Sequence, residues 1–338
     1  KKRSASDVSG KDAEALRGYS ELFTKHPDSK HAARARFMYA MGAKGLERRK
    51  LLAELDSDRV DAGTRAAALY YLGSETSDAD VLARCVKADP KGRYAPYAKL
   101  RRGAILAKSS DPAERRLALE QLLEIAFGAD RELAESALHL AATISFTEKK
   151  YGEAGSLWHR YLKNFPEGPN AADARACCAW CDYLTGKYAE AMALCGNGST
   201  DDLAYLLAAS VRATGDDVRA NTLFRSYLER FPNGRHRAEA ELPLARMAFE
   251  TAEKANDIAA LVEAAKRGAA LSKSAADRLR LAWAYEKSGH PAEAEREYLA
   301  VARDFPGTAE SAEALFRKGL NDLRAEKWAA AGGAGGEA

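Results

Sequence analysis

LAWAYEKSGHPAEAEREYLAVARDFP, residues 281–306, is the stretch that decides the fold of this chain. The small residues Ala282 and Ala294 let two antiparallel helices approach closely. Gly289 supplies a turn between these helices, and Pro306 ends the second one because proline cannot continue a helix. The stretch therefore predicts a helical hairpin.

Related hairpins are predicted along most of the chain, with small residues and terminal prolines in equivalent places. The helix-ending prolines recur at about twice the length of one hairpin, so alternate hairpins end in looser loops. A self-similar period near 34 residues predicts a solenoid of stacked helix pairs. The repeat positions are Ala142, Ala154, Pro166, Ala179, Ala191, Ala208, Ala220, Pro232, Ala282, Ala294 and Pro306.

The predicted fold is all-α, a right-handed α-solenoid of antiparallel helix pairs, with about eight units and a half-unit at each end. Asp111 and Pro112 mark the start of one helix, as cap and first residue. The predicted pairs span residues 32–55, 64–88, 94–127, 132–166, 170–196, 202–232, 237–271 and 281–306, with single helices at 11–26 and 310–323.

The domain organisation predicted from the same pattern has three parts. Residues 1–10 form a flexible N-terminal segment, and residues 332–338 form a glycine-rich tail. The superhelix occupies residues 11–331, less regular over 11–130 and more regular over 131–323. We expect the chain to be either a piece of a longer one or a solenoid with unusual end caps.

Composition supports a helical protein with a buried core. Apolar residues make up 46% of the chain and charged residues 30%, and alanine, leucine, glutamate and arginine dominate over β-branched residues. No run of about 18 apolar residues occurs, so we expect no membrane span. Any membrane anchor would lie outside this sequence.

The sequence carries no recognisable catalytic signature. The patterns GxSxG, GxGxxG and HExxH do not occur, and neither Gly10-Lys11 nor Gly186-Lys187 continues as a phosphate-binding loop. The six histidines are dispersed along the chain. We therefore expect no catalytic residue, no cofactor, no metal site and no small-molecule substrate.

Four cysteines form the one unusual group, at Cys177, Cys178, Cys181 and Cys195. They fall within a single predicted hairpin, so a zinc site or a disulfide is conceivable. However, adjacent residues on a helix point about 100° apart, so all four thiols cannot converge easily. The alternative is that Cys178 and Cys195 fill small positions in the core.

The candidate partner surface is the inner face of the solenoid, which the first helix of each pair would form. Aromatic residues with an occasional arginine are typical anchors of a peptide-binding groove. The alternative is that the aromatic residues pack against neighbouring repeats. The candidate residues on this face are His139, Phe146, Trp180, Tyr183, Tyr205, Arg212 and Trp283.

Nucleic-acid binding is a further alternative, because residues 1–125 contain 25 Lys and Arg against 18 Asp and Glu. Such binding needs basic side chains clustered on one face. The single dense basic group is Lys99, Arg101, Arg102, Arg115 and Arg116. Because dispersed charges are typical of solvated helix faces, we expect no nucleic-acid partner.

Residues 11–331 resemble tetratricopeptide repeats, with the large, small, turn-glycine and proline positions quoted above. The tails YLKNFP (161–166), YLERFP (227–232) and YLAVARDFP (298–306), and YSELFTKHP (19–27), resemble the repeats of the bacterial envelope proteins BamD and YbgF. This resemblance implies a non-catalytic scaffold of the periplasm or cell envelope that binds a protein or peptide on its concave face.

Two other roles fit the same fold. One is a cytoplasmic adaptor built of the same repeats. The other is the helical sensor or interaction part of a larger multidomain protein or enzyme.

Overall fold

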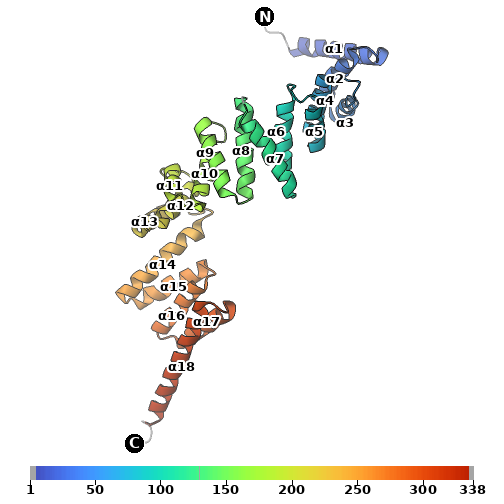
Figure 1. Ribbon diagram of the computed structural model, residues 1–338. Helices are drawn as coiled ribbons and strands as arrows, with labels where there is room; N and C mark the ends of the chain where they lie inside the picture. Colours follow the sequence, from blue (N-terminus) through green and yellow to red (C-terminus); the bar gives the residue numbers. More distant parts are fainter. Residues whose placement is uncertain (1–4, 129, 335–338) are drawn as a thin grey trace. The chain divides into compact units, whose positions relative to one another are not determined.

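The computed structural model describes residues 5–128 and 130–334, with side chains for 13–128 and 130–324, and every regular element in those ranges is an α-helix (Figure 1). The helices are α1 (Ala5–Lys25), α2 (Ala32–Gly42), α3 (Gly45–Ala53), α4 (Ala62–Thr76), α5 (Ala79–Ala88), α6 (Ala95–Leu106), α7 (Pro112–Ala126), α8 (Arg131–Thr147), α9 (Tyr151–Asn164), α10 (Ala171–Leu184), α11 (Tyr188–Cys195), α12 (Asp201–Ala213), α13 (Asp217–Arg230), α14 (Arg237–Ala255), α15 (Ile258–Leu271), α16 (Ala275–Lys287), α17 (Pro291–Asp304) and α18 (Ala309–Ala334).

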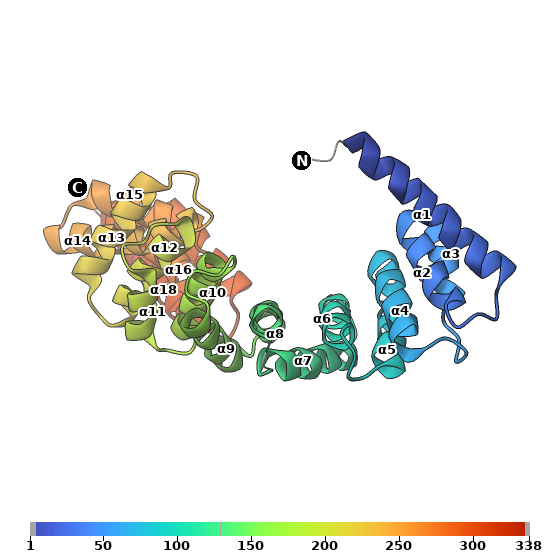
Figure 2. The same cartoon turned by 90° about the horizontal axis from the view of Figure 1, so that it is seen from above.

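The chain forms two compact units, unit 1 over residues 1–185 and unit 2 over residues 186–338. Within each unit, each helix packs against the next one in the sequence. In unit 1, α4 also contacts α6, and α6 contacts α8. Figure 2 shows these first helices along one edge of the row and α5 and α7 along the other. Each unit is therefore a stack of antiparallel hairpins.

These helices confirm the predicted all-α solenoid of helix pairs. Each of the eight predicted pair segments overlaps two helices, although α16 begins six residues before its segment, and α1 and α18 are the predicted single helices. Asp111 caps α7 by accepting a hydrogen bond from the Ala113 N–H at 2.9 Å, and Pro112 is its first residue. The right-handed sense of the superhelix stays a prediction.

The end helices are longer than the sequence pattern indicated. α1 begins at Ala5, inside the segment expected to be flexible, and α18 continues to Ala334, into the glycine-rich tail. Residues 1–4 and 335–338 of those two segments lie outside the described residues. The flexibility of both segments, and the division of the superhelix into a less and a more regular part, stay predictions.

Small side chains lie where the helices of a pair approach each other. Gly103 shows how tight this contact is, because a Cβ atom there would lie 2.8 Å from Leu122 Cγ. Such close packing excludes larger residues. The predicted alanines Ala142, Ala154, Ala179, Ala191, Ala208, Ala220, Ala282 and Ala294 are all 0% exposed.

Tyr161, in the first Tyr-Leu-x-x-Phe-Pro tail, joins successive pairs of unit 1. Its hydroxyl donates to Glu135 Oε1 at 2.6 Å and accepts from the Asn170 N–H at 3.2 Å. Burial, together with the hydrogen bond to Glu135, raises the pKa of Tyr161 to about 12. A Cβ at Gly168 would lie 2.3 Å from Glu135 Oε1 and 2.7 Å from Tyr161 Oη, so a larger residue there would displace one of these two side chains.

The same arrangement recurs in unit 2. Tyr227 Oη donates to Asp201 Oδ1 at 2.5 Å and accepts from the His236 N–H at 3.1 Å. A Cβ at Gly234 would lie 2.3 Å from Tyr227 Oη. The tail motif thus encodes a clamp that fixes the chain entering the next helix pair. In this clamp the tyrosine bridges an acid and a backbone amide, and the glycine leaves room for both.

The tail at 298–306 has a different structure, although its sequence begins with the same Tyr-Leu. Counted back from Phe305-Pro306, the clamp position is Val301, which is 0% exposed. Tyr298 lies one turn earlier and donates to Glu286 Oε2 at 2.6 Å. It therefore fills the core position that Phe224 occupies in the preceding tail, and this third tail lacks the tyrosine clamp.

Candidate functional site: a groove on the first helices of unit 2

The first helices of two successive hairpins in unit 2, α14 and α16, and the single helix α18 enclose a groove of about 430 Å³, here called the α16 groove. α14 and α18 provide its walls and α16 its floor, so it lies on the face where the sequence predicted a partner surface. Its lining residues are Phe249, Glu253, Ala276, Leu279, Arg280, Trp283, Glu310, Glu313 and Arg317.

An aromatic pair forms the apolar part of the groove. The rings of Phe249 and Trp283 lie 5.8 Å apart between centroids, tilted by 54°. Lys287 Nζ lies 5.4 Å from the centre of the Trp283 ring. Trp283 is half-buried, so part of its indole faces the groove. A tryptophan fixed in this way is a typical anchor for a partner side chain.

Arg280 is held at the groove by a buried carboxylate. Its Nη1 donates to Asp277 Oδ1 at 2.7 Å, and Arg246 donates to the same carboxylate at 2.9 and 2.6 Å. Ser274 Oγ adds a hydrogen bond at 2.8 Å. Burial opposes ionisation of Asp277, which is 1% exposed, but the hydrogen bonds outweigh burial and hold its pKa well below the ordinary value.

The α18 wall carries charges of both signs. Arg317 Nε donates to Glu313 Oε1 at 2.6 Å, and its Nη1 lies 4.0 Å from Glu286 Oε2. Among the described side chains, Glu253 and Glu310 form no ion pair or side-chain hydrogen bond. The groove therefore offers two unpaired carboxylates beside its aromatic floor.

A larger hollow, of about 640 Å³, lies between α14 and α15. Alanines and Leu244 line most of it, with Glu263, Lys266 and Arg267 at its edge. It has no aromatic anchor. The α16 groove is therefore the better candidate site, although it is the smaller hollow.

Trp283 is the one predicted partner residue that lies in the α16 groove. Tyr205 and Arg212 lie elsewhere in unit 2, on α12. Tyr205 stacks on His236 with ring centroids 4.4 Å apart, and the Arg212 guanidinium lies 5.8 Å from the centre of the Phe224 ring. Both side chains thus pack within unit 2.

The other predicted partner residues belong to unit 1. On α8, the ring of His139 lies 5.2 Å from that of Trp158 on α9, and the ring of Phe146 lies 5.5 Å from that of Tyr151, the first residue of α9. Burial lowers the pKa of His139, with opposing contributions from Asp173 and Glu135. On α10, the rings of Trp180 and Tyr183 lie 6.1 Å apart at 86°.

Sequence reasoning missed most of the residues that line the groove. Phe249, Trp283 and Arg317 are each 34 residues apart and occupy equivalent places on α14, α16 and α18. That spacing was a usable signal, because positions one repeat apart share a face of a solenoid. It would have led from Trp283 to the other two residues.

A cluster of tyrosines on α4 and α6 was also missed. The ring of Tyr70 lies 5.3 Å from those of Tyr71 and Tyr94 and 6.4 Å from that of Tyr97. Phe37, on α2, lies 5.9 Å from Tyr71. Tyr97 is 39% exposed, so the cluster has a solvent-facing edge. In the sequence, this cluster was indicated by pairs of aromatic residues on the first helices of successive helix pairs.

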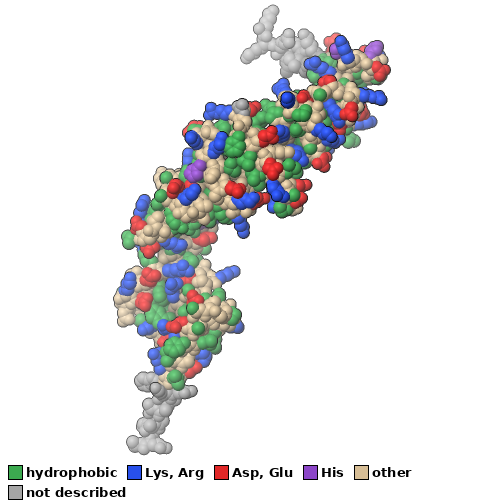
Figure 3. All heavy atoms as spheres, in the orientation of Figure 1, with side chains coloured by type: hydrophobic (Ala, Val, Ile, Leu, Met, Phe, Trp, Pro, Cys, Tyr) green, Lys and Arg blue, Asp and Glu red, His purple; other side chains and the backbone are tan. Residues whose placement is uncertain are grey.

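The basic group considered for nucleic-acid binding is largely engaged within unit 1. Lys99 pairs with Glu124 at 2.6 Å and Arg115 with Glu148 at 3.2 Å. Arg101 and Arg102 donate to backbone carbonyl oxygens. On the face shown in Figure 3, Lys and Arg side chains are interspersed with Asp and Glu. A continuous basic patch is therefore not visible on that face.

No disulfide joins the cysteines among the described residues, so the disulfide considered from the sequence is not formed there. Cys178, Cys181 and Cys195 are buried, and burial raises the pKa of Cys181 and Cys195 to about 12. A buried thiol that stays protonated behaves as a small apolar side chain. In addition, no helix among the described residues is both long and apolar enough to cross a bilayer.

No family model matches this sequence, and no curated protein matches it. Among solved structures, yeast Tom70 is 13% identical, with a TM-score of 0.39, over 89% of this chain and 65% of Tom70. The Cut9–Hcn1 heterotetramer of the APC/C is 14% identical, with a TM-score of 0.37, over 92% of this chain and 87% of that one. The TPR domain of P58(IPK) is 15% identical, with a TM-score of 0.30, over 92% of this chain and 90% of that one. The function proposed below therefore rests on this chain's own geometry.

Proposed function

We propose that this chain is a protein-interaction scaffold of the tetratricopeptide type, which captures a peptide segment of a partner protein in the α16 groove. The observation that carries the proposal is the Phe249–Trp283 pair beside the unpaired carboxylates of Glu253 and Glu310. An aromatic floor with charged walls is typical of a peptide groove. The role requires no catalytic group.

The chemistry of the groove defines the peptide. One apolar side chain would pack on the indole of Trp283 and remove apolar surface from water. One lysine or arginine would pair with Glu253 or Glu310. Arg280 and Arg317 already face carboxylates, but a guanidinium has five N–H donors, so both can also donate to peptide carbonyl oxygens. The expected ligand is thus a short segment that combines apolar and basic residues.

Selection of peptides from a random library tests this proposal. Peptides that bind the wild-type chain should be enriched in an apolar residue close to a lysine or arginine. Trp283→Ala should weaken their binding at least tenfold, which is about 1.4 kcal/mol or more. Glu253→Gln combined with Glu310→Gln should reduce the preference for the basic residue.

The matched control is Phe146→Ala, which removes a half-buried aromatic from a first helix of unit 1. This variant should bind the selected peptides as tightly as the wild type does. Equal loss of binding in both variants would contradict the proposal, and so would full binding by Trp283→Ala. Melting curves of both variants separate lost binding from lost folding.

We further propose that the scaffold works in the bacterial periplasm or cell envelope. Support comes from the Tyr-Leu-x-x-Phe-Pro tails, whose sequence resembles the repeats of BamD and YbgF. Fractionation of cells that express the tagged, full-length gene product tests the location. Recovery of the protein in the cytoplasm would favour the alternative that it is a cytoplasmic adaptor. A catalytic domain encoded in the same reading frame would favour the alternative that these repeats are the interaction part of a larger enzyme.

A further inference from the structure

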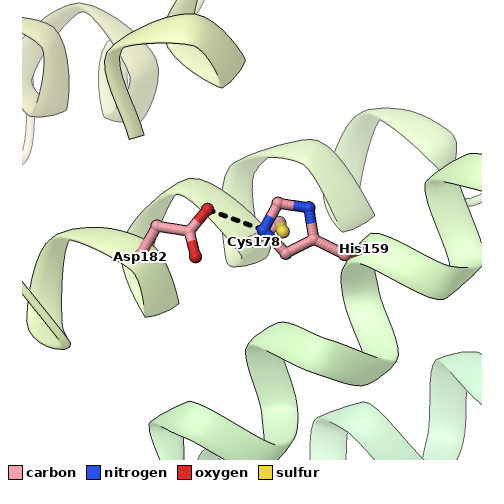
Figure 4. Close-up of side chains that lie close together, drawn as sticks. All are labelled: His159, Cys178 and Asp182. Atoms are coloured by element: carbon pink, nitrogen blue, oxygen red, sulfur yellow. Dashed lines mark hydrogen bonds and ion pairs between the residues drawn. The ribbon is translucent and has the colours of Figure 1, made fainter. Parts of the chain in front are cut away.

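An imidazole, a thiol and a carboxylate meet between α9 and α10 in unit 1 (Figure 4). The ligand atoms of His159, Cys178 and Asp182 all lie within 4.8 Å of one another. His159 Nε2 is 2.8 Å from Asp182 Oδ2, and Cys178 Sγ donates to the carbonyl oxygen of Gly155 at 3.9 Å. The α16 groove uses none of these side chains.

The helix spacing explains why the three groups meet. Cys178 and Asp182 are four residues apart, so they share one face of α10, and Gly155 and His159 share one face of α9 in the same way. A Cβ at Gly155 would lie 3.2 Å from the Cβ of Cys181 and 3.8 Å from Asp182 Oδ1. The missing side chain thus allows the two helices to approach closely beside the cluster.

Burial makes the cluster unusual for a structural ion pair. Cys178 and Asp182 are 0% and 1% exposed, whereas the His159 side chain is 44% exposed. A carboxylate removed from water is costly unless a positive charge or strong donors compensate it. The exposed imidazole gives an ion a path to the two buried groups.

We propose that His159, Cys178 and Asp182 bind a zinc ion, with a water molecule as its fourth ligand. Nitrogen, sulfur and oxygen donors together suit Zn²⁺, whereas Ca²⁺ and Mg²⁺ prefer oxygen alone. The thiol of Cys178 loses its proton to solvent when the Zn–S bond forms. Thiolate and carboxylate then balance both charges of the ion. Zn–N and Zn–O bonds replace the His159–Asp182 hydrogen bond; His159 Nε2 loses its proton to solvent and Nδ1 takes one up, so the imidazole binds in its neutral form.

The separations fit this coordination after small side-chain rotations. Zinc bonds of about 2.3 Å to sulfur and about 2.0–2.2 Å to nitrogen and oxygen put tetrahedral ligand atoms about 3.3–3.7 Å apart. The observed range, from 2.8 Å between His159 and Asp182 to at most 4.8 Å overall, brackets that value. His159 Nε2 and Asp182 Oδ2 must therefore move slightly apart, and Cys178 Sγ must move closer to both of them.

The ion would join the α8–α9 pair of unit 1 to the next helix, α10. α9 is the second helix of its pair, and α10 is the next helix in the chain. A ligand that binds only the folded form stabilises it, so zinc should stabilise this part of unit 1. No metal site was predicted from the sequence, because the six histidines are dispersed along the chain and the cysteines of one helix point in different directions.

Cobalt binding tests the proposal, because Co²⁺ reports thiolate ligation through a charge-transfer absorption that Zn²⁺ lacks. The untagged full-length chain, reduced and freed of metal by a chelator, is titrated with Co²⁺ and then with Zn²⁺. The wild type should bind one equivalent of Co²⁺ with this absorption, and Zn²⁺ should abolish it. Cys178→Ser should remove the absorption, and His159→Ala should weaken metal binding at least tenfold.

Cys85→Ser is the matched control. Cys85 is also a fully buried thiol of unit 1 and donates to the carbonyl oxygen of Ala66 at 3.1 Å. This variant should bind Co²⁺ as the wild type does. The proposal is overturned if the folded wild type shows no thiolate absorption, or if the absorption survives in Cys178→Ser. His159 is partly exposed, so unchanged metal affinity in His159→Ala would also overturn it, even if Cys178→Ser does not fold.

Discussion

At the scale of single residues, the turn inside most helix pairs depends on one left-handed residue. Gly186, Gly215 and Gly289 take φ values of 78°, 89° and 74°, which glycine adopts without strain. Lys149 occupies the same place between α8 and α9 with φ of 61°. A residue with a Cβ is strained in this backbone conformation. The strain at Lys149 therefore lowers the free energy of unfolding, and a glycine at this position would remove it.

Lys149→Gly should stabilise the chain, because glycine relieves the left-handed strain. The greater freedom of glycine in the unfolded chain offsets part of the gain, which leaves a net increase of about 0.5–1 kcal/mol in the free energy of unfolding. Urea denaturation measures it. Lys187→Gly is the control, since Lys187 has φ of −85° and the change relieves nothing. Destabilisation by Lys149→Gly would contradict the explanation.

The tyrosine clamp makes a second residue-scale prediction. Gly168→Ala places a Cβ against Glu135 Oε1 and Tyr161 Oη, so it should lower the free energy of unfolding by about 1–3 kcal/mol. Gly152→Ala is the control: nothing lies within 4 Å of a Cβ there, so alanine should raise stability by about 0.5–1 kcal/mol. Thermal melting compares the two variants. Equal shifts of the same sign would rule out the clamp.

The sequence revealed the clamp only in part. The Tyr-Leu-x-x-Phe-Pro-x-Gly pattern was visible at residues 161–168 and 227–234. However, the acid that each tyrosine contacts lies on the first helix of its pair, 26 residues earlier, and it is Glu135 in one case and Asp201 in the other. A spatial pairing with a variable partner leaves no short motif. For the same reason, Tyr298 was grouped with Tyr161 although it fills another position.

At the scale of helices, the buried carboxylate of Asp277 joins α14 to α16. The Arg246–Asp277 pair is bidentate, with distances of 2.9 and 2.6 Å, and it supports the floor of the α16 groove. Removing one partner of a buried pair leaves the other charges uncompensated. The helix packing beneath the groove should therefore depend on this single residue.

Asp277→Asn should lower the free energy of unfolding by about 2–3 kcal/mol, less than for a fully buried pair because Arg246 and Arg280 are 37% and 36% exposed. The control is Asp304→Asn, which breaks ion pairs at the surface and should change stability little. Urea denaturation at neutral pH checks both variants. An equal effect of the two substitutions would contradict the importance of burial.

Acid should progressively reduce the difference in stability between the wild type and Asp277→Asn. The folded pKa of Asp277 lies below its unfolded value, which is about 4. Its contribution to stability is thus complete above about pH 4 and is lost as the pH falls through the folded pKa. Unfolding free energies measured from pH 7 down to pH 2 should converge. A constant difference over that range would show that charge is not the cause.

Helix positions were more predictable from the sequence than helix lengths. Small residues, glycine turns and prolines marked the pairs because each has a steric reason to recur. α18 extends past the expected end at residue 323 to Ala334, since its alanine-rich continuation contains no proline to stop it. α14 runs through Pro243, a residue that normally interrupts a helix.

At the scale of the whole molecule, the repeat period determines the fold but not the binding site. Nested hairpins follow from small residues that recur along the chain, so the solenoid was predictable. The α16 groove depends on which side chains face one another across three helices. Trp283 was therefore found by its type, whereas Phe249 and Arg317 required the spatial register of α14, α16 and α18.

Hydrogen–deuterium exchange of the chain, with and without a selected apolar and basic peptide, tests the proposed groove most directly. Peptide binding should slow amide exchange in residues 246–255, 276–287 and 309–320, which form the three helices around the groove. Exchange in α15 and in unit 1 should stay unchanged. Protection confined to α15, or to any helix of unit 1, would contradict the assignment of the α16 groove as the binding site.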